Sequence, residues 1–469
     1  MRRKNQYFYV SMAVIIAALL VSMLLHILWN KREQEQQEQQ LNVESKLPFG
    51  NYLPTAENPL IRVVLKTNGF QQITHNEVKI SCASGLVIYS GGVSSTDGAT
   101  DSATRETDST DGGTDSTTRE TDSATREVSA GEIFTIKPDD AGFQTGSIRI
   151  EPKTESERIT IHSLTRGYGT PSYRGVMELY SSAEGIVIVN EVPLEEYLCA
   201  VVPSEMPASY APEALKCQAV CARSYAYCQM LAFAYPVYNA HVDDSVSFQV
   251  YGNSKEQEST TYAVIETAGK KLQYCNEVVK TYYYSTSCGH STGVEAWGTA
   301  PTEANNYLQG IPICNEAGEA YEAKLPWYRW KAVIPQKTLS NLIELNTKTE
   351  IGTLRSLTIT KQGAGGVALQ LVAKGTRGSV TVDTENKIRA SLGGSGYTIE
   401  KQDGTVVKST KLLPSAFFTI AKHGENYIIE GGGYGHGIGM SQNGANEMAK
   451  AGKTYEEILT FFYPGTKVE

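Results

Sequence analysis

A single glutamate stands between two prolines in the segment Pro203-Ser204-Glu205-Met206-Pro207, shortly before a long helix-like stretch. Pro207 disfavours helical geometry at Met206, and Pro203 presets its own φ, so the segment predicts a rigid corner that cannot relax into helix. A carboxylate fixed in this way is a candidate for donating and accepting a proton. The alternative is that Glu205 belongs to an ordinary turn between helices and faces solvent.

Two other stretches could carry chemistry. Cys288 and His290 could be metal ligands or a thiol and imidazole pair, but two residues at this spacing are a weak signal. Residues 431–439 contain six glycines, which allow close backbone approach before the next helix. Phosphate binding is the rival interpretation of such a loop, but no GK[ST] sequence or dinucleotide-binding unit accompanies it.

Three motifs together resemble one family. VVPSEMPASY followed by EALKCQAVCARSYAY, then KTYYYSTSCGHSTGVEAWG and GYGHGIGMSQNGA, are similar to the motifs of the sporulation stage II protein D family, also described as SpoIID/LytB. Two positions of the second motif depart from the family pattern, since Tyr284 replaces a His and Cys288 replaces a Gly. The resemblance implies a peptidoglycan lytic transglycosylase whose catalytic residue is Glu205. It also implies these substrate ligands: Gln218, Arg223, Ser285, Ser287, His436 and Gln442.

One carboxyl group suffices for such a reaction, because the substrate's own hydroxyl replaces the water that a hydrolase must activate. Two other functions stay open: a muramidase that uses water, and a non-catalytic enhancer of a cell-wall amidase. The resemblance further implies a role in septal wall remodelling during engulfment. The implied partners are peptidoglycan strands, an amidase or endopeptidase, and a membrane protein of the engulfment machinery.

Residues 241–252 resemble a family segment in which some members hold zinc through a Cys and His cluster. Here Val242 to Phe248 contains neither Cys nor His, which leaves His241 alone. Because a protein zinc site needs three or four ligands, we expect no metal and no other cofactor.

The elements around these motifs indicate an α+β, β-rich fold with short strands and a few helices around a central cleft. Residues 7–29 are almost wholly apolar and follow three basic residues, which predicts a membrane span with the rest of the chain outside the cytoplasm; a cleaved secretory signal is the alternative. The predicted parts are a cytoplasmic tail (1–7), a transmembrane helix (8–29), a stalk (30–58), a β-rich domain (59–192) and a catalytic domain (193–469).

The net charge of −9 comes mainly from one insert. Residues 94–127 hold six Asp, three Glu and three Arg, and residues 100–127 form four seven-residue repeats without apolar positions. The repeats predict a disordered loop within the β-rich domain, either a tolerated expansion or a site of O-glycosylation or proteolysis. Since the remainder is close to neutral, nothing indicates a nucleic-acid partner.

The eight cysteines do not predict a disulfide framework. Cys217, Cys221 and Cys228 recur along one face of a predicted helix, so we expect small buried apolar residues and few disulfides.

Overall fold

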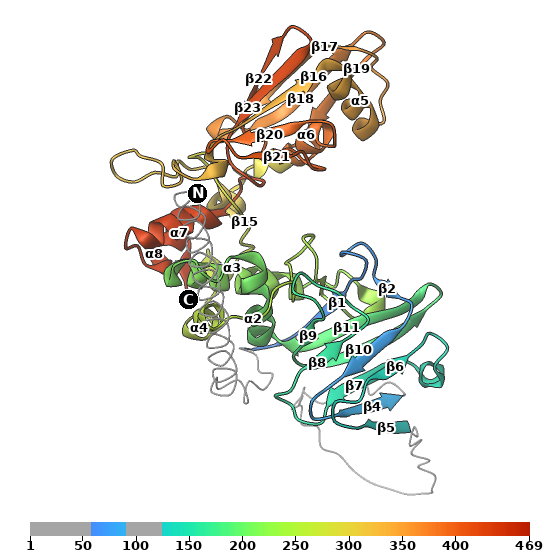
Figure 1. Cartoon of the computed structure of the whole chain (residues 1–469). Coiled ribbons are helices and arrows are strands. Elements are labelled where there is room, and N and C mark those ends of the chain that lie inside the picture. Colours follow the sequence, from blue (N-terminus) through green and yellow to red (C-terminus); the bar gives the residue numbers. More distant parts are fainter. Residues whose placement is uncertain (1–57, 91–123) are drawn as a thin grey trace, which may run out of the picture. The chain divides into compact units, whose positions relative to one another are not determined.

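The computed structural model describes residues 58–90 and 124–469 (Figure 1). The predicted tail, the transmembrane segment and nearly all of the stalk lie outside the described residues. In the part of the chain that the structure describes, no helix combines the length and the apolar character needed to cross a membrane. The membrane anchor stays a prediction.

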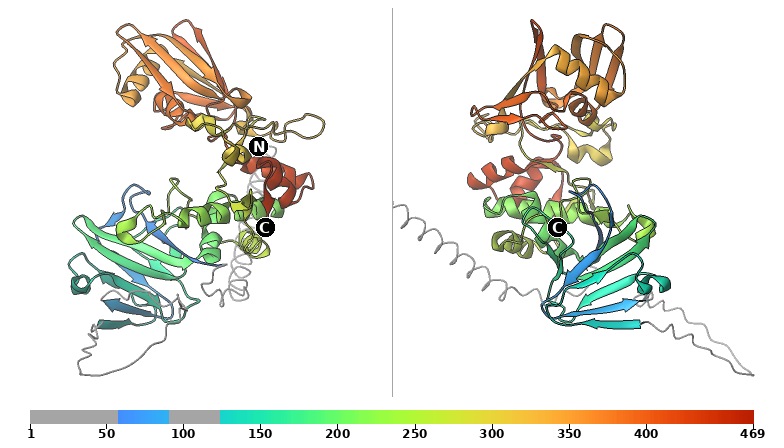
Figure 2. Two further views of the ribbon diagram at one scale, coloured as in Figure 1. Left: turned by 180° about the vertical axis from the view of Figure 1, so that it is seen from behind. Right: turned by 45° about the vertical axis from the view of Figure 1, so that its right-hand side comes forward.

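Two sheets form the first part of the described chain (Figures 1 and 2). The larger has the order β12-β1-β11-β10-β7-β4-β5, with β2 beside β11, and the smaller has the order β6-β3-β8-β9. Strand β11 (Gly185–Pro193) is buried almost throughout, as its apolar run predicts. The other strands are β1 (Leu60–Leu65), β2 (Thr74–His75), β3 (Val78–Ser81), β4 (Leu86–Ser90), β5 (Ala124–Val128), β6 (Phe134–Ile136), β7 (Ile148–Pro152), β8 (Ile159–Ile161), β9 (Ser172–Tyr173), β10 (Val176–Ser182) and β12 (Val242–Asp243).

The prediction that residues 94–127 are disordered is wrong for the last four residues, 124–127. Residues 91–123 lie outside the described residues, but residues 124–127 belong to strand β5, which pairs antiparallel with β4 from Leu86 to Ser90. The polar composition alone gave no reason to expect a strand. The backbone of β4 supplies the hydrogen-bonding partners with which residues 124–128 form strand β5.

Five helices gather around the proline-flanked glutamate. Helices α2, α3 and α4 pack on one another, and α7 and α8 pack on α3. Their bounds are α2 (Leu194–Glu205), α3 (Pro212–Met230), α4 (Glu258–Glu266), α7 (Gln442–Lys450) and α8 (Tyr455–Phe462).

The prediction that residues 203–207 form a corner outside any helix is wrong for Pro203 to Glu205. Helix α2 runs through Pro203 and ends at Glu205, and extended backbone begins at Met206 (φ −133°, ψ 136°). Pro203 removes only one backbone hydrogen bond from the helix. The helix tolerates this loss because the Met206 N–H still closes the last turn onto the Val202 carbonyl (2.9 Å). Pro207 accounts for the extended residue before it.

Residues 330–431 form two further sheets, of order β21-β20-β16-β23-β22 and β17-β18-β19. The runs LRSLTIT and VALQLVAKG, rich in β-branched and other apolar residues, form most of β17 and β18, and residues 385–392 form the short helix α6. The elements are β16 (Trp330–Pro335), α5 (Gln336–Thr347), β17 (Leu354–Gln362), β18 (Ala368–Gly375), β19 (Ser379–Asp383), α6 (Glu385–Leu392), β20 (Thr398–Lys401), β21 (Val406–Lys408), β22 (Phe418–His423) and β23 (Asn426–Gly431).

Short strands join the motif segments. Strand β15 (Tyr283–Tyr284) pairs in parallel with β24 (Met440–Ser441), so two motifs that are far apart in sequence lie side by side. A third small sheet consists of β13 (Leu272–Tyr274), β14 (Glu277–Val278) and β25 (Lys467–Val468). The described chain is therefore α+β and β-rich, as predicted.

Candidate active site

The carboxyl group of Glu205 lies in a desolvated place at the end of α2. Its Oε1 accepts a hydrogen bond from the Val250 N–H (2.6 Å), and the Tyr283 hydroxyl lies within hydrogen-bonding reach. Burial raises the pKa of this carboxyl to about 7, although the contacts with Val250 and Tyr283 lower it in part. Because the carboxyl is desolvated, the solvent-facing alternative does not hold, although the residue as a whole keeps some exposed surface.

A buried amide orients Tyr283. Gln249 is 1% exposed; its Oε1 accepts from the Tyr197 hydroxyl (3.3 Å) and its Nε2 donates to the Tyr283 hydroxyl (3.2 Å). Since the Tyr283 oxygen accepts this bond, its own proton is available to Glu205. The sequence analysis missed both residues, although Gln249 and Tyr283 lie inside the segments that carry the family resemblance.

The loop that presents the Val250 N–H is anchored in the N-terminal sheet. Strand β12 at its start pairs with β1, and Asp244 forms an ion pair with Arg166 in which both side chains are buried. Asp244 also accepts from the Lys66 N–H (3.0 Å). These contacts fix the loop against the sheet and thereby fix the hydrogen bond to Glu205.

His436 holds the backbone of Tyr283. The Ile438 N–H donates to its Nδ1 (3.1 Å), so Nε2 carries the proton and donates to the Tyr283 carbonyl (2.9 Å). Burial lowers the pKa of His436 to about 4, so the ring is neutral near pH 7. Because backbone groups occupy both ring nitrogens, His436 fits a positioning residue better than the predicted substrate ligand.

Gln442 and Gln218 join α7 to the end of α2. The Gln442 Nε2 donates to the Glu205 carbonyl (3.0 Å) and to the Gln218 Oε1 (3.1 Å). Gln218 is fully buried, and no described residue bonds its Nε2. The structure thus brings these two predicted residues together at Glu205, where they hold its backbone.

Arg223 has no donor left for a substrate. Its side chain is fully buried and forms a bidentate ion pair with Glu195 (both 2.7 Å). The remaining N–H groups donate to Thr267 Oγ1, the Lys270 carbonyl and the Val264 carbonyl. Arg223 therefore ties α2, α3 and α4 together, and the prediction that it binds substrate does not fit its position.

The two predicted serines differ in environment. Ser285 is partly exposed, and its hydroxyl contacts only the Thr286 hydroxyl (3.1 Å), so it stays a candidate ligand. Ser287 is buried, and both its N–H (2.9 Å) and its hydroxyl donate to Glu322. It is held by this carboxyl and does not face a ligand.

Glu322 is a second buried carboxyl that the sequence analysis missed. It is fully buried, accepts also from the Ser441 hydroxyl (2.8 Å), and has a pKa raised to about 7 by burial. No local sequence signal marks it, because its partners come from segments 35 and 119 residues away. Its contacts link the segment that follows β15 to the N-cap of α7.

The residues present do not fit a zinc site. The Arg62 N–H donates to the His241 Nδ1 (3.0 Å), which occupies that nitrogen. Nowhere in residues 58–90 or 124–469 do three His, Cys, Asp or Glu side chains group so that they could hold a metal ion. The Cys288 thiol has a pKa raised by burial, which makes a nucleophilic thiolate unfavourable.

Comparison with known proteins places this geometry in a family. A family model described as stage II sporulation protein matches residues 182–274, and one described as a domain of unknown function matches residues 290–439. Stage II sporulation protein D of Bacillus subtilis (strain 168) is 31% identical over 336 residues, covering 67% of this chain and 85% of that protein. The protein of the same name from Bacillus amyloliquefaciens is 32% identical over 295 residues, covering 60% and 75%.

A protein named amidase enhancer, from Bacillus subtilis (strain 168), is 29% identical over 304 residues, which cover 57% of this chain and 40% of that protein. The similarity to the sporulation proteins is both higher and more complete. The resemblance seen in the three sequence motifs is confirmed, and the chain belongs to the stage II sporulation protein D family.

Proposed function

We propose that this protein is a peptidoglycan lytic transglycosylase that cleaves the β-1,4 bond between N-acetylmuramic acid and N-acetylglucosamine and leaves 1,6-anhydro ends. The supporting observation is the Glu205 carboxyl, whose pKa is raised to about 7 without any charged side chain contributing to the shift. Such a group exchanges a proton readily near neutral pH. The activity would serve wall remodelling in sporulation, with the protein anchored in the membrane and its described part outside the cytoplasm.

The proposed reaction uses one carboxyl twice. Protonated Glu205 gives its proton to the glycosidic oxygen as that oxygen leaves C1 of the muramic acid. The resulting carboxylate then takes the proton of the C6 hydroxyl of the same sugar, whose oxygen bonds to C1 and closes the anhydro ring. Glu205 ends protonated, as it began, and no water is consumed.

The contacts of Glu205 suit both stages. The Val250 N–H and the Tyr283 hydroxyl stabilise the carboxylate that exists between the two proton transfers. Gln249 and His436 hold Tyr283 from its hydroxyl and its backbone, respectively. The anionic intermediate state is therefore stabilised by groups already in place before substrate binds.

A muramidase that uses water would need a second carboxyl free to activate that water or to act as nucleophile. Among the buried carboxyls near the motif segments, Glu322 accepts hydrogen bonds from Ser287 and Ser441, while Asp244 and Glu195 are paired with Arg166 and Arg223. That arrangement favours a structural role for Glu322. A muramidase would leave reducing sugar ends, which the assay below separates from anhydro ends.

The test is Glu205→Gln in the full chain, assayed by mass spectrometry of products from purified glycan strands. The amide keeps the shape but cannot exchange the proton, so we expect anhydro product to fall by about 10²–10⁴-fold. Glu277→Gln, at an exposed position on β14, is the matched control and should leave the rate unchanged. Undiminished release by Glu205→Gln, with the same unfolding midpoint as the wild type, would reject the assignment.

A non-catalytic amidase enhancer is the second candidate, suggested by the relative that carries that name. The two are separated by adding a cell-wall amidase to the same assay. A transglycosylase releases anhydro ends from peptide-free strands without any amidase. An enhancer releases none and only accelerates the amidase's liberation of stem peptides. An amidase or endopeptidase partner is part of the proposal in either case.

A further inference from the structure

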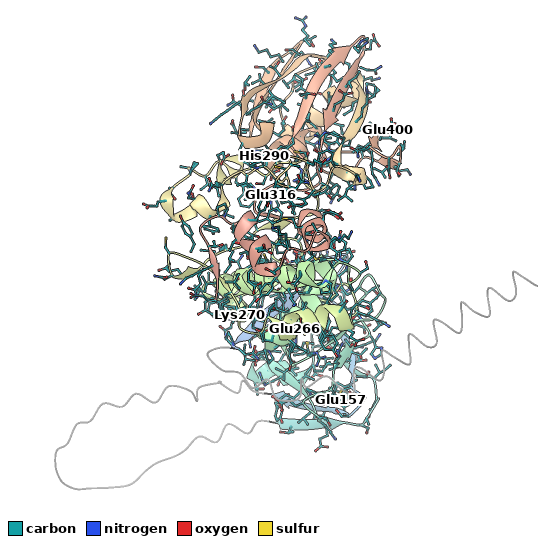
Figure 3. All side chains as sticks on the ribbon, turned by 90° about the vertical axis from the view of Figure 1, so that its left-hand side faces the viewer. Glu157, Glu266, Lys270, His290, Glu316 and Glu400 are labelled. Carbon is teal, nitrogen blue, oxygen red and sulfur yellow. The ribbon has the colours of Figure 1, made fainter. Side chains whose placement is uncertain are left out.

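A pocket of about 990 Å³ lies apart from the Glu205 contacts, at the ends of β16, β20 and β23. None of the seven site residues predicted from the sequence lines it. His290 and Glu400, which do line it, are labelled in Figure 3. Nearly all of its lining falls within residues 290–439, the segment that matches a domain of unknown function.

Two cations at this pocket, Arg329 and Lys401, form no direct ion pair among the described residues, although the charge of Lys401 acts on the nearby Asp403 carboxyl. Arg329 is exposed; its Nη1 donates to the Cys288 (3.0 Å) and Tyr328 (2.7 Å) carbonyls, and its guanidinium lies 3.9 Å from the centre of the Tyr328 ring. Lys401 holds its Nζ 4.9 Å from the centre of the Trp327 ring. Aromatic rings and carbonyls, and no directly bonded carboxylate, position both charges.

Lys331, a third cation at the pocket, differs from these two because it has a carboxylate partner. Lys331 forms an ion pair with Glu430 (2.8 Å) and stands opposite Glu400 in the β16–β20 register. Its charge is compensated on both sides. The positive potential of the pocket therefore comes from Arg329 and Lys401, whose backbones are neighbours, since the Gln402 N–H donates to the Arg329 carbonyl (2.9 Å).

The wall of the pocket is built to stay open. A Cβ on Gly432 would lie 2.5 Å from the Tyr328 carbonyl oxygen, and one on Gly431 would lie 2.3 Å from the Trp330 ring. Only glycine fits at either position, because the chain lies directly against Tyr328 and Trp330 there. Ring faces beside peptide groups and cations suit a ligand with a sugar or peptide body and an anionic group.

The pocket is close along the chain to the candidate active site. Tyr434 is 41% exposed, packs against Trp327 (ring centres 4.8 Å apart), and forms a backbone bridge with Thr286. From Tyr283, beside Glu205, to Cys288, at the pocket, is five residues along the chain, at most about 18 Å when extended. A short polymer could span that distance across the exposed face of Tyr434.

We propose that this pocket is a second binding site for the wall polymer, in which Arg329 and Lys401 hold a carboxylate of the strand being cleaved at Glu205. The inference rests on the proposed function. Two sources of carboxylate share this chemistry: the lactyl group of muramic acid freed of peptide, and the carboxylates of an attached stem peptide.

The experiment measures binding to the full chain carrying Glu205→Gln, so that nothing is cleaved during titration. The probes are a chitin oligosaccharide without carboxylates, peptide-free glycan strands, and strands with stem peptides. The added variant is the double substitution Arg329→Gln and Lys401→Gln, and its matched control is Lys331→Gln, which removes a paired lysine from the same pocket.

We expect the double variant to bind carboxylate-bearing strands at least ten-fold more weakly, while the chitin oligosaccharide and the Lys331→Gln control show no change. Weakening with peptide-free strands identifies the lactyl group, and weakening only with stem-bearing strands identifies the peptide. Equal loss for all three probes, or no loss for either charged strand, overturns the proposal. If Glu205→Gln keeps full activity, the transglycosylase assignment is rejected. The binding measurement still shows whether Arg329 and Lys401 hold a carboxylate.

Discussion

The Glu205 carboxyl combines burial with two hydrogen-bond donors, and these act on its pKa in opposite directions. Burial opposes the charged form, whereas the Val250 N–H and the Tyr283 hydroxyl favour it. The hydroxyls of Tyr197, Tyr225 and Tyr283 face the same carboxyl, and burial together with its charge raises their pKa values, so they stay neutral. Glu205 is thus the group that titrates near neutral pH in this cluster.

Tyr283→Phe should move the pH dependence of activity. The acid form of Glu205 starts the reaction, so kcat/KM should fall as pH rises through about 7 in the wild type. Removing a donor to the charged form raises the carboxyl pKa, so the fall should move upward by about one pH unit. The measurement is kcat/KM against pH for both proteins. An unshifted alkaline limb would mean that Tyr283 does not contact the carboxyl.

At the scale of residues, the sequence predicted Glu205 as the proposed acid but not the residues that bond to it or orient its partners, Tyr283 and Gln249. Glu205, Gln218 and Gln442 come together as their motifs suggested, because each motif is a contiguous segment. Arg223 and His436 were assigned to substrate since a motif does not reveal which donors the fold itself consumes. A buried arginine needs a carboxylate partner, and Glu195 lies on a different helix, where no spacing rule finds it.

At the scale of elements, the Arg223 and Glu195 pair joins α2 to its neighbours. Arg223→Met keeps an unbranched, shorter apolar side chain and leaves the Glu195 carboxylate buried without a cation. We expect a loss of about 3–5 kcal/mol in the free energy of unfolding, measured by urea denaturation. Arg377→Met is the matched control, because its pair with Glu350 is solvent-exposed and should contribute less than about 1 kcal/mol. Equal effects of the two substitutions would contradict the assigned role.

The strands and helices could be predicted largely from local pattern, and the errors are informative. Pro212 opened α3 as expected, because proline suits the first helical turn. Pro203 did not end α2, and residues 124–127 did not stay irregular. Residues 124–127 gained backbone partners from the neighbouring strand β4, whereas the last turn of α2 closes within the helix through the Met206 N–H and the Val202 carbonyl; no local pattern records either.

At the scale of the whole molecule, stability comes from packing and not from covalent links. All eight cysteines fall within the described residues and are free thiols; Cys217 and Cys221 are fully buried on α3, as predicted. The helices around Glu205 share one apolar cluster with the sheets of residues 330–431.

Reduction should therefore leave the thermal unfolding midpoint unchanged. A structural disulfide would contribute about 2–5 kcal/mol, so its reduction would lower the midpoint visibly. The measurement compares melting with and without dithiothreitol, together with a thiol count on denatured, unreduced protein, where we expect eight. Cys275→Ser removes the exposed thiol and controls for links between molecules. A lower midpoint in dithiothreitol would show that a disulfide had formed.

The hydrogen bond from Gln442 to the backbone of Glu205 joins residues 237 positions apart. While the chain is being made, the acid is synthesised long before the amide that holds it, and α3 cannot yet rest against α7. The glutamate therefore has its working surroundings only once nearly the whole chain has been delivered. Under the proposed function, wall-cleaving activity therefore arises only when synthesis is almost complete.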